Sequence, residues 1–460
     1  MKGVTFFTMY QGLTSILSED QLTINASVRE QHSHDESYHT PHLPDVVVFP
    51  QSKEEVAKIL QYASTHKLPV VPFAVGSSLE GHAIPIRGGI SLDMMRMNRI
   101  LEIRPDDFLV HVEPGVTREE LNEALKKFGL FFPVDPGANA SIGGMVATNA
   151  SGTTTVKYGA MKEQVRKLEV VLANGEIIDT GSLAIKSSSG YHLTELFIGS
   201  EGTLGVITGI WLRVYGIPES MVAARATFPT IEQCVATTTA IMGAGIPVAR
   251  MELVDPAAMR GVNFYKKTSY PEVPTVFFEF HGSKESLEQD MERVKEIAND
   301  EGCSTFDVEK SEEERRRLWD ARHVAATAFL SQYPGKKQIV TDVCLPLSEL
   351  PGAVKKAHEW LEELDLPGGI VGHVGDGNFH TILAIDPDNQ EDMQKAEDFN
   401  EKLVGDALKR GGTCTGEHGV GLGKMKYQAE EHGSALLIMR AIKTLLDPYD
   451  IMNPGKLIDQ

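Results

Sequence analysis

The chain has 460 residues, 42% of them hydrophobic and 23% charged, which is the composition of a folded protein large enough for two or three domains. Its formal net charge of -20 would repel nucleic-acid phosphates and anionic lipid headgroups, so neither is an expected partner. No uninterrupted apolar stretch approaches the roughly 20 residues of a membrane-spanning helix. We expect a cytoplasmic protein without a cleaved signal, whose membrane contact, if any, would be peripheral.

Residues 45–215 alternate short apolar runs with amphipathic segments and glycine-rich turns, as α/β and α+β domains do. Two helix starts fit a capping box, in which a hydroxyl and a carboxylate satisfy reciprocal free amides: Ser52 with Glu55, and Thr117 with Glu120. Strands are predicted at residues 70–73 and 205–214. The first domain is expected to end near residues 216–218.

Residues 222–424 differ, because longer helical segments are separated by a few strand-like runs. The expected helices are residues 283–299, 312–333, 351–364 and 391–410. The expected strands are residues 276–280, 339–345, 370–373 and 379–385. This pattern predicts an α+β domain with an antiparallel sheet, and another helix is expected after residue 425.

Three segments of the first domain are dense in glycine, serine and threonine: residues 76–81, 136–152 and 199–205. Glycine lets backbone amides point into a concave nest and hydroxyls add donors, so such segments can hold a pyrophosphate without positive side chains. None has the G-x-G-x-x-G pattern of a Rossmann fold, and His82 with Ala83 stands where a P-loop has lysine and serine or threonine. The alternative is a set of tight turns without a ligand.

The segment from His373 to His380 lies between two predicted strands and contains two glycines, which imply a tight turn that brings both imidazoles together. The distant segment 416–419 adds Glu417 and His418 between two glycines. His373, His380 and Glu417 therefore predict a divalent-metal site with open positions, suited to zinc or manganese, with His418 beside it as a proton acceptor. The alternative is that these polar residues are unrelated.

Several segments together resemble the flavin-dependent D-2-hydroxy-acid dehydrogenases, a family that includes cytochrome-type D-lactate dehydrogenase, the D subunit of glycolate oxidase and D-2-hydroxyglutarate dehydrogenase. The resemblance covers nearly the whole chain. Its carriers are residues 72–81 (PFAVGSSLEG), 139–144 with 149–152, 199–205 (GSEGTLG), 373–380 (HVGDGNFH), 412–419 (GTCTGEHG) and 453–456 (NPGK).

The resemblance implies an α+β chain with an FAD-binding domain of the vanillyl-alcohol-oxidase (PCMH) type and a ferredoxin-like α+β cap domain. The expected ranges are 1–40 for an N-terminal extension, 41–220 for the FAD-binding domain, 221–425 for the substrate- and metal-binding cap, and 426–460 for a segment that returns to the FAD domain. The residues expected to hold FAD are Val75, Gly76, Ser77, Ser78, Leu79, Pro136, Gly137, Ser141, Gly143, Gly144, Asn149, Gly152, Glu201, Gly202, Gly205, Ile207 and Asn453.

In that family the residues matching His373, His380 and Glu417 hold the metal, and the one matching His418 is the base. Relatives also place the arginine of a W-x-x-R run at the substrate, which assigns Arg322 to the substrate carboxylate, since a guanidinium can bind a carboxylate in bidentate fashion. Lys336 and Lys337 are second candidates, with an exposed basic turn as the alternative. The implied reaction passes a hydroxyl proton to His418 and a hydride to flavin N5.

His82 stands where many relatives have a second glycine after the first loop. Some members of the wider superfamily attach FAD covalently to histidine near such a loop, but this branch usually binds FAD noncovalently, as we expect here. We also expect no appended iron–sulfur domain, so that electrons pass to a separate acceptor: a cytochrome, a quinone, an electron-transfer flavoprotein or an iron–sulfur subunit. A homodimer is left open.

The expected substrate is D-lactate or glycolate, with D-2-hydroxyglutarate and longer acids left open. Two other functions compete with this one. A metallohydrolase could use the same three ligands to activate water, although it leaves the glycine segments unexplained. The other alternative is a D subunit that acts only within a larger glycolate-oxidising complex. Such a subunit could also serve there as a noncatalytic scaffold, but a scaffold would not need the metal ligands and the base.

Overall fold

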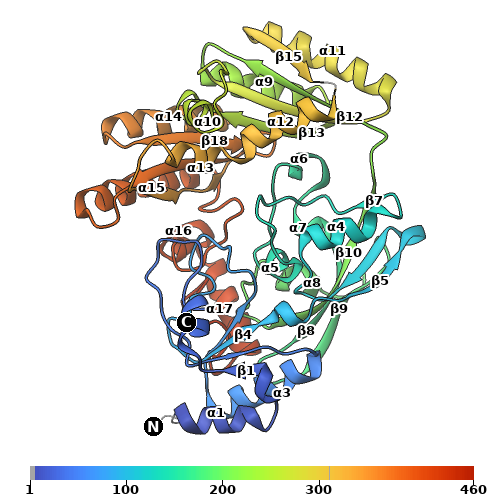
Figure 1. Ribbon diagram of the computed structural model, residues 1–460, viewed down its shortest axis with the longest axis vertical. Helices are drawn as coiled ribbons and strands as arrows, with labels where there is room; N and C mark the ends of the chain where they lie inside the picture. The colour runs from blue at the N-terminus through green and yellow to red at the C-terminus, as the bar shows by residue number, and fades with distance from the viewer. Residues whose placement is uncertain (1–5, 310, 460) are drawn as a thin grey trace. The chain divides into compact units, whose positions relative to one another are not determined.

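The computed structural model describes residues 6–309 and 311–459, which form two compact units (Figure 1). Unit 1 contains the described residues up to Ser151, Ala160–Ile217 and the described residues from Glu417 onward; unit 2 contains Gly152–Gly159 and the described residues of Pro218–Gly416. Both units combine helices with sheets, so the predicted α+β class is confirmed. Among the described residues, no helix is long and apolar enough to cross a bilayer.

Unit 1 is built on two sheets. The first has the order β1-β2-β4-β3, with β2, β3 and β4 parallel, and the second is antiparallel with the order β5-β6-β10-β8-β9. The strands, with the short pair β7 and β11, are β1 (Leu22–Thr23), β2 (Val46–Val48), β3 (Val70–Phe73), β4 (Ile90–Asp93), β5 (Ile100–Arg104), β6 (Leu109–Val112), β7 (Leu130–Phe131), β8 (Val165–Val171), β9 (Ile177–Gly181), β10 (Val206–Arg213) and β11 (Tyr215–Gly216). The predicted strands at 70–73 and 205–214 are confirmed as β3 and β10.

The predicted capping boxes of unit 1 differ in outcome. Thr117 and Glu120 form the box of α4 (Arg118–Lys126). Ser52 caps α3 (Lys53–His66), but the second half of its box is wrong, because the Glu55 carboxylate accepts hydrogen bonds from the Gln51 amide and the Gln21 side chain instead. The other helices of unit 1 are α1 (Phe6–Thr14), α2 (Ala26–Gln31), α5 (Ile142–Ala147), α7 (Met161–Gln164), α8 (Leu193–Phe197), α16 (Gln428–His432) and α17 (Ala435–Leu446).

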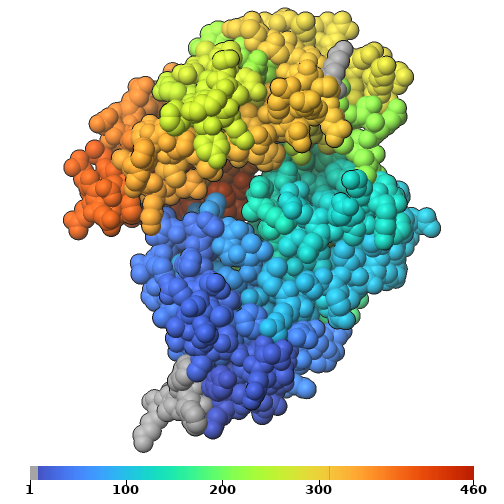
Figure 2. All heavy atoms as spheres, in the orientation of Figure 1, coloured from blue at the N-terminus to red at the C-terminus, as the bar shows by residue number. Residues whose placement is uncertain are grey.

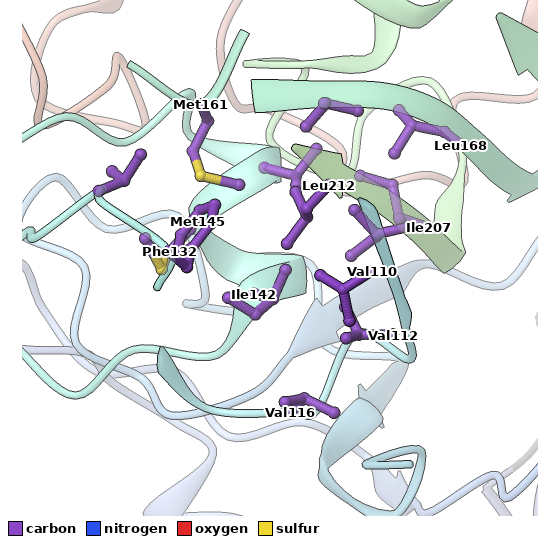
Figure 3. Close-up of a cluster of buried hydrophobic side chains, with 14 of the residues drawn as sticks. Val110, Val112, Val116, Phe132, Ile142, Met145, Met161, Leu168, Ile207 and Leu212 are labelled. Atoms are coloured by element: carbon purple, nitrogen blue, oxygen red, sulfur yellow. The ribbon is translucent and has the colours of Figure 1, made fainter. Parts of the chain in front are cut away.

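One hydrophobic core of unit 1 lies between α5 and the five-stranded sheet (Figure 3). Val110 and Val112 alternate along β6 and point toward Ile142 of α5, and all three side chains are fully buried. The C-terminal helix α17 packs Ile442 and Leu446 against the same cluster. Residues far apart in the sequence therefore complete one core, on which α5 and its glycines rest.

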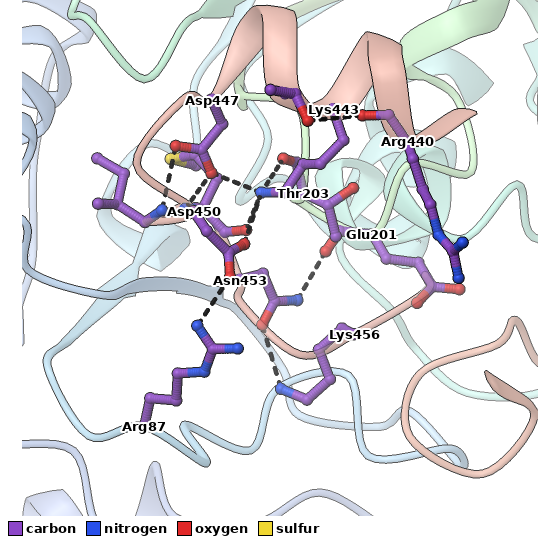
Figure 4. A network of polar contacts seen from close by, with 12 residues as sticks. Arg87, Glu201, Thr203, Arg440, Lys443, Asp447, Asp450, Asn453 and Lys456 are labelled. Atoms are coloured by element: carbon purple, nitrogen blue, oxygen red, sulfur yellow. Dashed lines mark hydrogen bonds and ion pairs between the residues drawn. The ribbon is translucent and has the colours of Figure 1, made fainter. Parts of the chain in front are cut away.

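A buried lysine fixes the end of α17 to the rest of unit 1 (Figure 4). Lys443 Nζ donates to the Asp447 carboxylate and to the carbonyls of Thr203 (3.0 Å) and Met452 (2.9 Å). The same carboxylate accepts from the amides of Ile451 (3.1 Å) and Met452 (2.8 Å). Each partner in this ion pair is thus hydrogen-bonded, which is the condition under which buried charges are tolerated.

Unit 2 is built on an eight-stranded antiparallel sheet in which β15-β12-β14-β13-β18-β19-β16 are neighbours and β17 also pairs with β19. Its strands are β12 (Ser220–Thr227), β13 (Val248–Val254), β14 (Thr275–Gly282), β15 (Thr305–Glu309), β16 (Lys337–Val340), β17 (Val343–Cys344), β18 (Gly368–His373) and β19 (Asn378–Ile385). Its helices are α6 (Thr155–Tyr158), α9 (Ile231–Gly243), α10 (Pro256–Lys266), α11 (Lys284–Asp300), α12 (Glu312–His323), α13 (Ala325–Leu330), α14 (Leu350–Glu363) and α15 (Gln390–Lys409). The α11 segment lies at the surface of this unit (Figure 2).

Alternation along the strands of unit 2 decides which side chains meet α10, α12 and α13. Val254, Val371 and Ile382 join these helices in one buried cluster. Residues an even number of positions away on the same strands point to the same face, which places Glu252, His373 and His380 on it. The polar residues of this face therefore continue directly from an apolar core.

Two predicted elements of unit 2 are interrupted, while the others are confirmed. The helix predicted at 312–333 divides at Val324 into α12 and α13, which lets Phe329 pack closely on α10: a Cβ on Gly261 would lie 2.7 Å from the Phe329 Cα. The strand predicted at 339–345 divides into β16 and β17, because the fully buried Asp342 binds Asn378 and Gly416 instead of continuing the strand.

Replacing Lys443 with methionine should lower the free energy of unfolding by about 3–5 kcal/mol, because it leaves the buried Asp447 carboxylate without its counter-charge. Denaturant unfolding followed by circular dichroism measures the change. Arg440→Met on the same helix is the control, since its hydrogen bond to the Asp459 carbonyl lies at the surface. Equal stability of the two variants would contradict the proposed importance of the Lys443 contacts.

Candidate active site

Unit 1 contains a cavity lined by all three glycine-rich segments. Its empty volume is about 1370 Å³ with the open mouth included. The loop after β3, the α5 segment and residues 201–207 each form part of its wall. Walls from three glycine-rich loops suit a phosphate-bearing dinucleotide cofactor.

Of the residues expected to hold FAD, all except Gly137, Asn149 and Gly152 line this cavity. The Asn149 side chain accepts from the Lys162 amide (3.0 Å), and the Gly152 amide donates to Thr155 Oγ1 (3.0 Å), so both serve local turns. Gly137 has a φ of +76° and lies in a turn. Ser151 also lines the cavity and was not among the predicted residues, although it directly precedes Gly152 in the same glycine-rich segment.

The loop of residues 75–79 has the properties of an anion-binding nest. None of the hydrogen bonds between described residues is donated by the backbone amides of these five residues. Gly76 has a φ of +75°, which a residue with a Cβ rarely adopts. Ser78 Oγ donates to the Asp35 carboxylate (2.8 Å) and so fixes the loop. Unsatisfied amides on a cavity wall fit the phosphates of a dinucleotide.

Glu201 lines the cavity, but its carboxylate is occupied by the protein. Its oxygens accept from the amides of Val420 (2.7 Å) and Gly421 (2.9 Å), and one of them lies 3.3 Å from His82 Nε2. The side chain is 2% exposed. Glu201 thus holds the backbone just after His418, a role that no local sequence pattern predicts because these contacts span about half of the chain.

The His82–Glu201 contact shifts the pKa values of both groups toward their charged forms in spite of burial. Burial alone lowers the pKa of His82, but the Glu201 carboxylate, supported by Asp35 and Glu80, outweighs burial and raises the pKa above its usual value. Burial likewise raises the pKa of Glu201, but His82 and the two backbone amides lower it further than burial raises it.

The C-terminal residues connect two loops of the cavity wall (Figure 4). Asn453 lines the cavity and donates to the carbonyls of His82 (3.1 Å) and Glu201 (2.7 Å). Lys456 donates to the Ile84 carbonyl and to Asn453 Oδ1 (3.2 Å), and burial lowers the pKa of Lys456 to about 8. These contacts give the NPGK turn a structural role in unit 1.

His373 and His380 lie in the predicted hairpin of β18 and β19. His373 pairs with Asn378 and His380 with Val371, and their ring centroids are 5.4 Å apart with planes 81° from parallel. His373 Nδ1 lies 2.7 Å from Glu252 Oε1, and His380 Nδ1 lies 3.2 Å from the Thr341 carbonyl. The hairpin thus brings two buried, oriented imidazoles together, as ligands of one metal ion require.

Arg322 on α12 is buried in unit 2 and forms an ion pair with Glu252, with 2.6 Å between Nη2 and Oε2. Among the described residues, the buried Arg322 Nε has no hydrogen-bond partner. The second candidates differ: Lys336 pairs with Asp392 (3.0 Å), and Lys337 is exposed. The fully buried Glu252 was missed because no local pattern marks it.

Glu417 and His418 line the cavity of unit 1, where Glu417 accepts from Ser151 Oγ (2.5 Å). The residues just before them are bound in unit 2, because Asp342 accepts from Thr415 Oγ1 (2.6 Å) and the Gly416 amide (2.7 Å). Asp342 also accepts from Asn378 in the histidine hairpin (2.7 Å). Glu417 follows this anchor by one peptide bond, and its carboxylate, like the two hairpin imidazoles, is a donor type that zinc and manganese accept.

Both parts of the chain match known families. Residues 44–181 match an FAD binding domain, and residues 217–457 match the C-terminal domain of FAD linked oxidases. The chain belongs to the FAD-linked oxidases. It is 46% identical to the probable mitochondrial D-lactate dehydrogenase of Danio rerio, over 97% of this chain and 90% of that protein. It is 34% identical to glycolate oxidase subunit GlcD of Bacillus subtilis, over 93% of this chain and 91% of that protein.

Solved structures of the same fold include 4-ethylphenol oxidase from Gulosibacter chungangensis, with a TM-score of 0.81 and 17% identity over 99% of this chain and 98% of that one. p-Cresol methylhydroxylase has a TM-score of 0.80 and 18% identity with the same coverage. The PCMH-type fold expected for this FAD-dependent oxidoreductase is therefore confirmed.

Replacing His82 with glutamine should destabilise the protein most between pH 4.5 and 6.5, the ordinary pKa values of glutamate and histidine. The raised pKa of His82 gives stability that is complete below 6.5 and is lost as the pH rises through its folded value. The lowered pKa of Glu201 gives stability that is complete above 4.5 and is lost as the pH falls through its folded value. Melting temperatures of both proteins across this range and at pH 9 measure the effect; a pH-independent difference would contradict the charged pair.

Proposed function

We propose that this FAD-linked oxidase converts a D-2-hydroxy acid, with D-lactate and glycolate as first candidates, to the 2-oxo acid. The observation that carries the proposal is the position of Glu417 and His418. They line the same cavity as the loops proposed for FAD, while the two residues before them are bound to Asp342 beside the histidine hairpin. The names of the relatives, D-lactate dehydrogenase and glycolate oxidase, support this substrate class.

In the proposed site His373, His380 and Glu417 hold one zinc or manganese ion, and the cavity residues of unit 1 hold FAD. When bound, the flavin supplies a hydride acceptor at N5 and the ion supplies positive charge for the substrate hydroxyl. Arg322 binds the substrate carboxylate through its donor Nε, in a buried setting that strengthens the attraction. His418 accepts the hydroxyl proton on an imidazole nitrogen.

The reduced enzyme would pass its electrons to a separate cytochrome, quinone, electron-transfer flavoprotein or iron–sulfur subunit. The likeness to glycolate oxidase subunit GlcD favours a second candidate function, in which the chain acts as the oxidising subunit of a larger complex. A hydrolase built on the same metal ligands would have no use for an FAD-binding domain over residues 44–181, so it is not proposed further. A cytoplasmic location and a homodimer complete the proposal.

D-Lactate or glycolate added without oxygen should bleach the flavin of the purified protein. Chelation should abolish bleaching, and His418→Ala should slow it about 10²–10⁴-fold because the hydroxyl proton then has no acceptor. Stopped-flow absorbance measures the rate, with His192→Ala as the control, since that histidine is exposed. Bleaching by L-acids alone, or at an unchanged rate in His418→Ala, would refute the proposal.

Arg322→Met should lower kcat/KM for the hydroxy acid by about 10²-fold or more, because the substrate carboxylate loses a charge-assisted hydrogen bond and Glu252 loses its counter-charge. Arg317→Met on the same helix is the control, since its pairing with Glu313 lies at the surface. Steady-state kinetics with a dye acceptor compare the two. Equal values of kcat/KM would remove Arg322 from the substrate site.

A further inference from the structure

We infer that Glu252 is a positioning residue that sets both the metal ligand His373 and the carboxylate-binding Arg322, so that one side chain couples metal affinity to substrate affinity. The inference rests on the proposed function, because it takes the roles of His373 and Arg322 from it. The contacts that support it all lie within unit 2.

Glu252 has no exposure to solvent, and its two oxygens have different partners. Oε1 lies 2.7 Å from His373 Nδ1, and Oε2 lies 2.6 Å from Arg322 Nη2. A buried carboxylate is costly unless it is paired, so the ion pair at Oε2 and the His373 contact at Oε1 both favour fixed positions of the two partners. β13 presents this carboxylate on the same face of the sheet as the histidine hairpin.

The contact with His373 selects the form of the imidazole that binds metals. A carboxylate is an acceptor, so the proton of His373 belongs on Nδ1, and the lone pair is on Nε2 at the opposite side of the ring. Carboxylate partners of this kind orient metal-binding histidines and raise their basicity. Removing such a partner typically costs 10–100-fold in metal affinity.

The contact with Arg322 fixes the second half of the site. The guanidinium is planar and rigid, so anchoring Nη2 on Glu252 determines where Nε points. Nε is the donor without a partner among the described residues. A shift of Glu252 would therefore move the metal ligand and the substrate clamp together, and this is the physical basis of the coupling.

Unit 2 offers a close chemical match for a control. Glu279 on β14 is also buried, with His281 Nε2 at 2.8 Å and Arg250 Nε at 3.4 Å. Like Glu252, it is a carboxylate between a histidine and an arginine, but neither partner belongs to the proposed metal or substrate site. A purely structural role of buried glutamates would make the two positions equivalent.

The test uses the full-length, oxidised, FAD-loaded protein after treatment with chelator. Zinc and manganese affinities are measured by competition with a chromophoric chelator, and pyruvate affinity by perturbation of the flavin absorbance with and without manganese. In Glu252→Gln the amide nitrogen, itself a donor, faces either His373 or Arg322 in place of a carboxylate oxygen. This variant should lose 10–100-fold in metal affinity. In this variant, manganese should no longer tighten pyruvate binding. Glu279→Gln should stay within about twofold of the parent protein.

Glu252→Asp keeps the charge and should retain part of the metal affinity; it replaces Glu252→Gln in the same comparison if the amide variant does not fold. Equal metal affinity in the parent and the Glu252 variant, or equal losses in both glutamine variants, would overturn the inference and leave the proposed function standing. A parent protein that binds neither metal would overturn the inference and the metal role in the proposed function together.

Discussion

The position of the proposed base depends on the buried carboxylate of Glu201. The carboxylate accepts hydrogen bonds from the backbone amides of Val420 and Gly421, and His82 forms an ion pair with it. The segment fits against the first glycine loop only because Gly421 has no side chain: a Cβ there would lie 2.1 Å from the Glu80 carbonyl oxygen. His418 is therefore held on the cavity wall by backbone contacts on its C-terminal side.

A second buried carboxylate holds the other end of the same segment. Asp342 accepts from Thr415 and the Gly416 amide, as well as from Asn378 in the histidine hairpin. Only residues 417–419 separate the backbone anchored by Asp342 from the backbone anchored by Glu201. Glu417 and His418 thus have little conformational freedom, and catalytic groups held in this way lose little entropy when a substrate binds. The glycines on both sides allow the sharp turns that two such close anchors require.

The success of sequence-based prediction followed the range of the interactions. The hairpin of His373 and His380 was predictable because the strands, the glycines and both histidines lie within a few residues of one another. The same holds for the Thr117 cap and for the strands β3 and β10. Glu252 could not be found, because its contact with His373 spans 121 residues. The Glu55 carboxylate accepts from the nearby Gln51 amide and from Gln21, which is 34 residues away, and the second contact could not be predicted from a local pattern.

Charge gives the proposed metal ion a role beyond its chemistry. The chain is acidic, with a net charge of -20, and an anionic substrate must approach against that field. Arg322 is the cation proposed for the substrate carboxylate, but Glu252 neutralises it at 2.6 Å. The buried Asp342 and the proposed ligand Glu417 would then leave the proposed site negative. A divalent cation would cancel these two charges. The proposed ion would thus make the site able to accept a carboxylate, in addition to acting on the hydroxyl group.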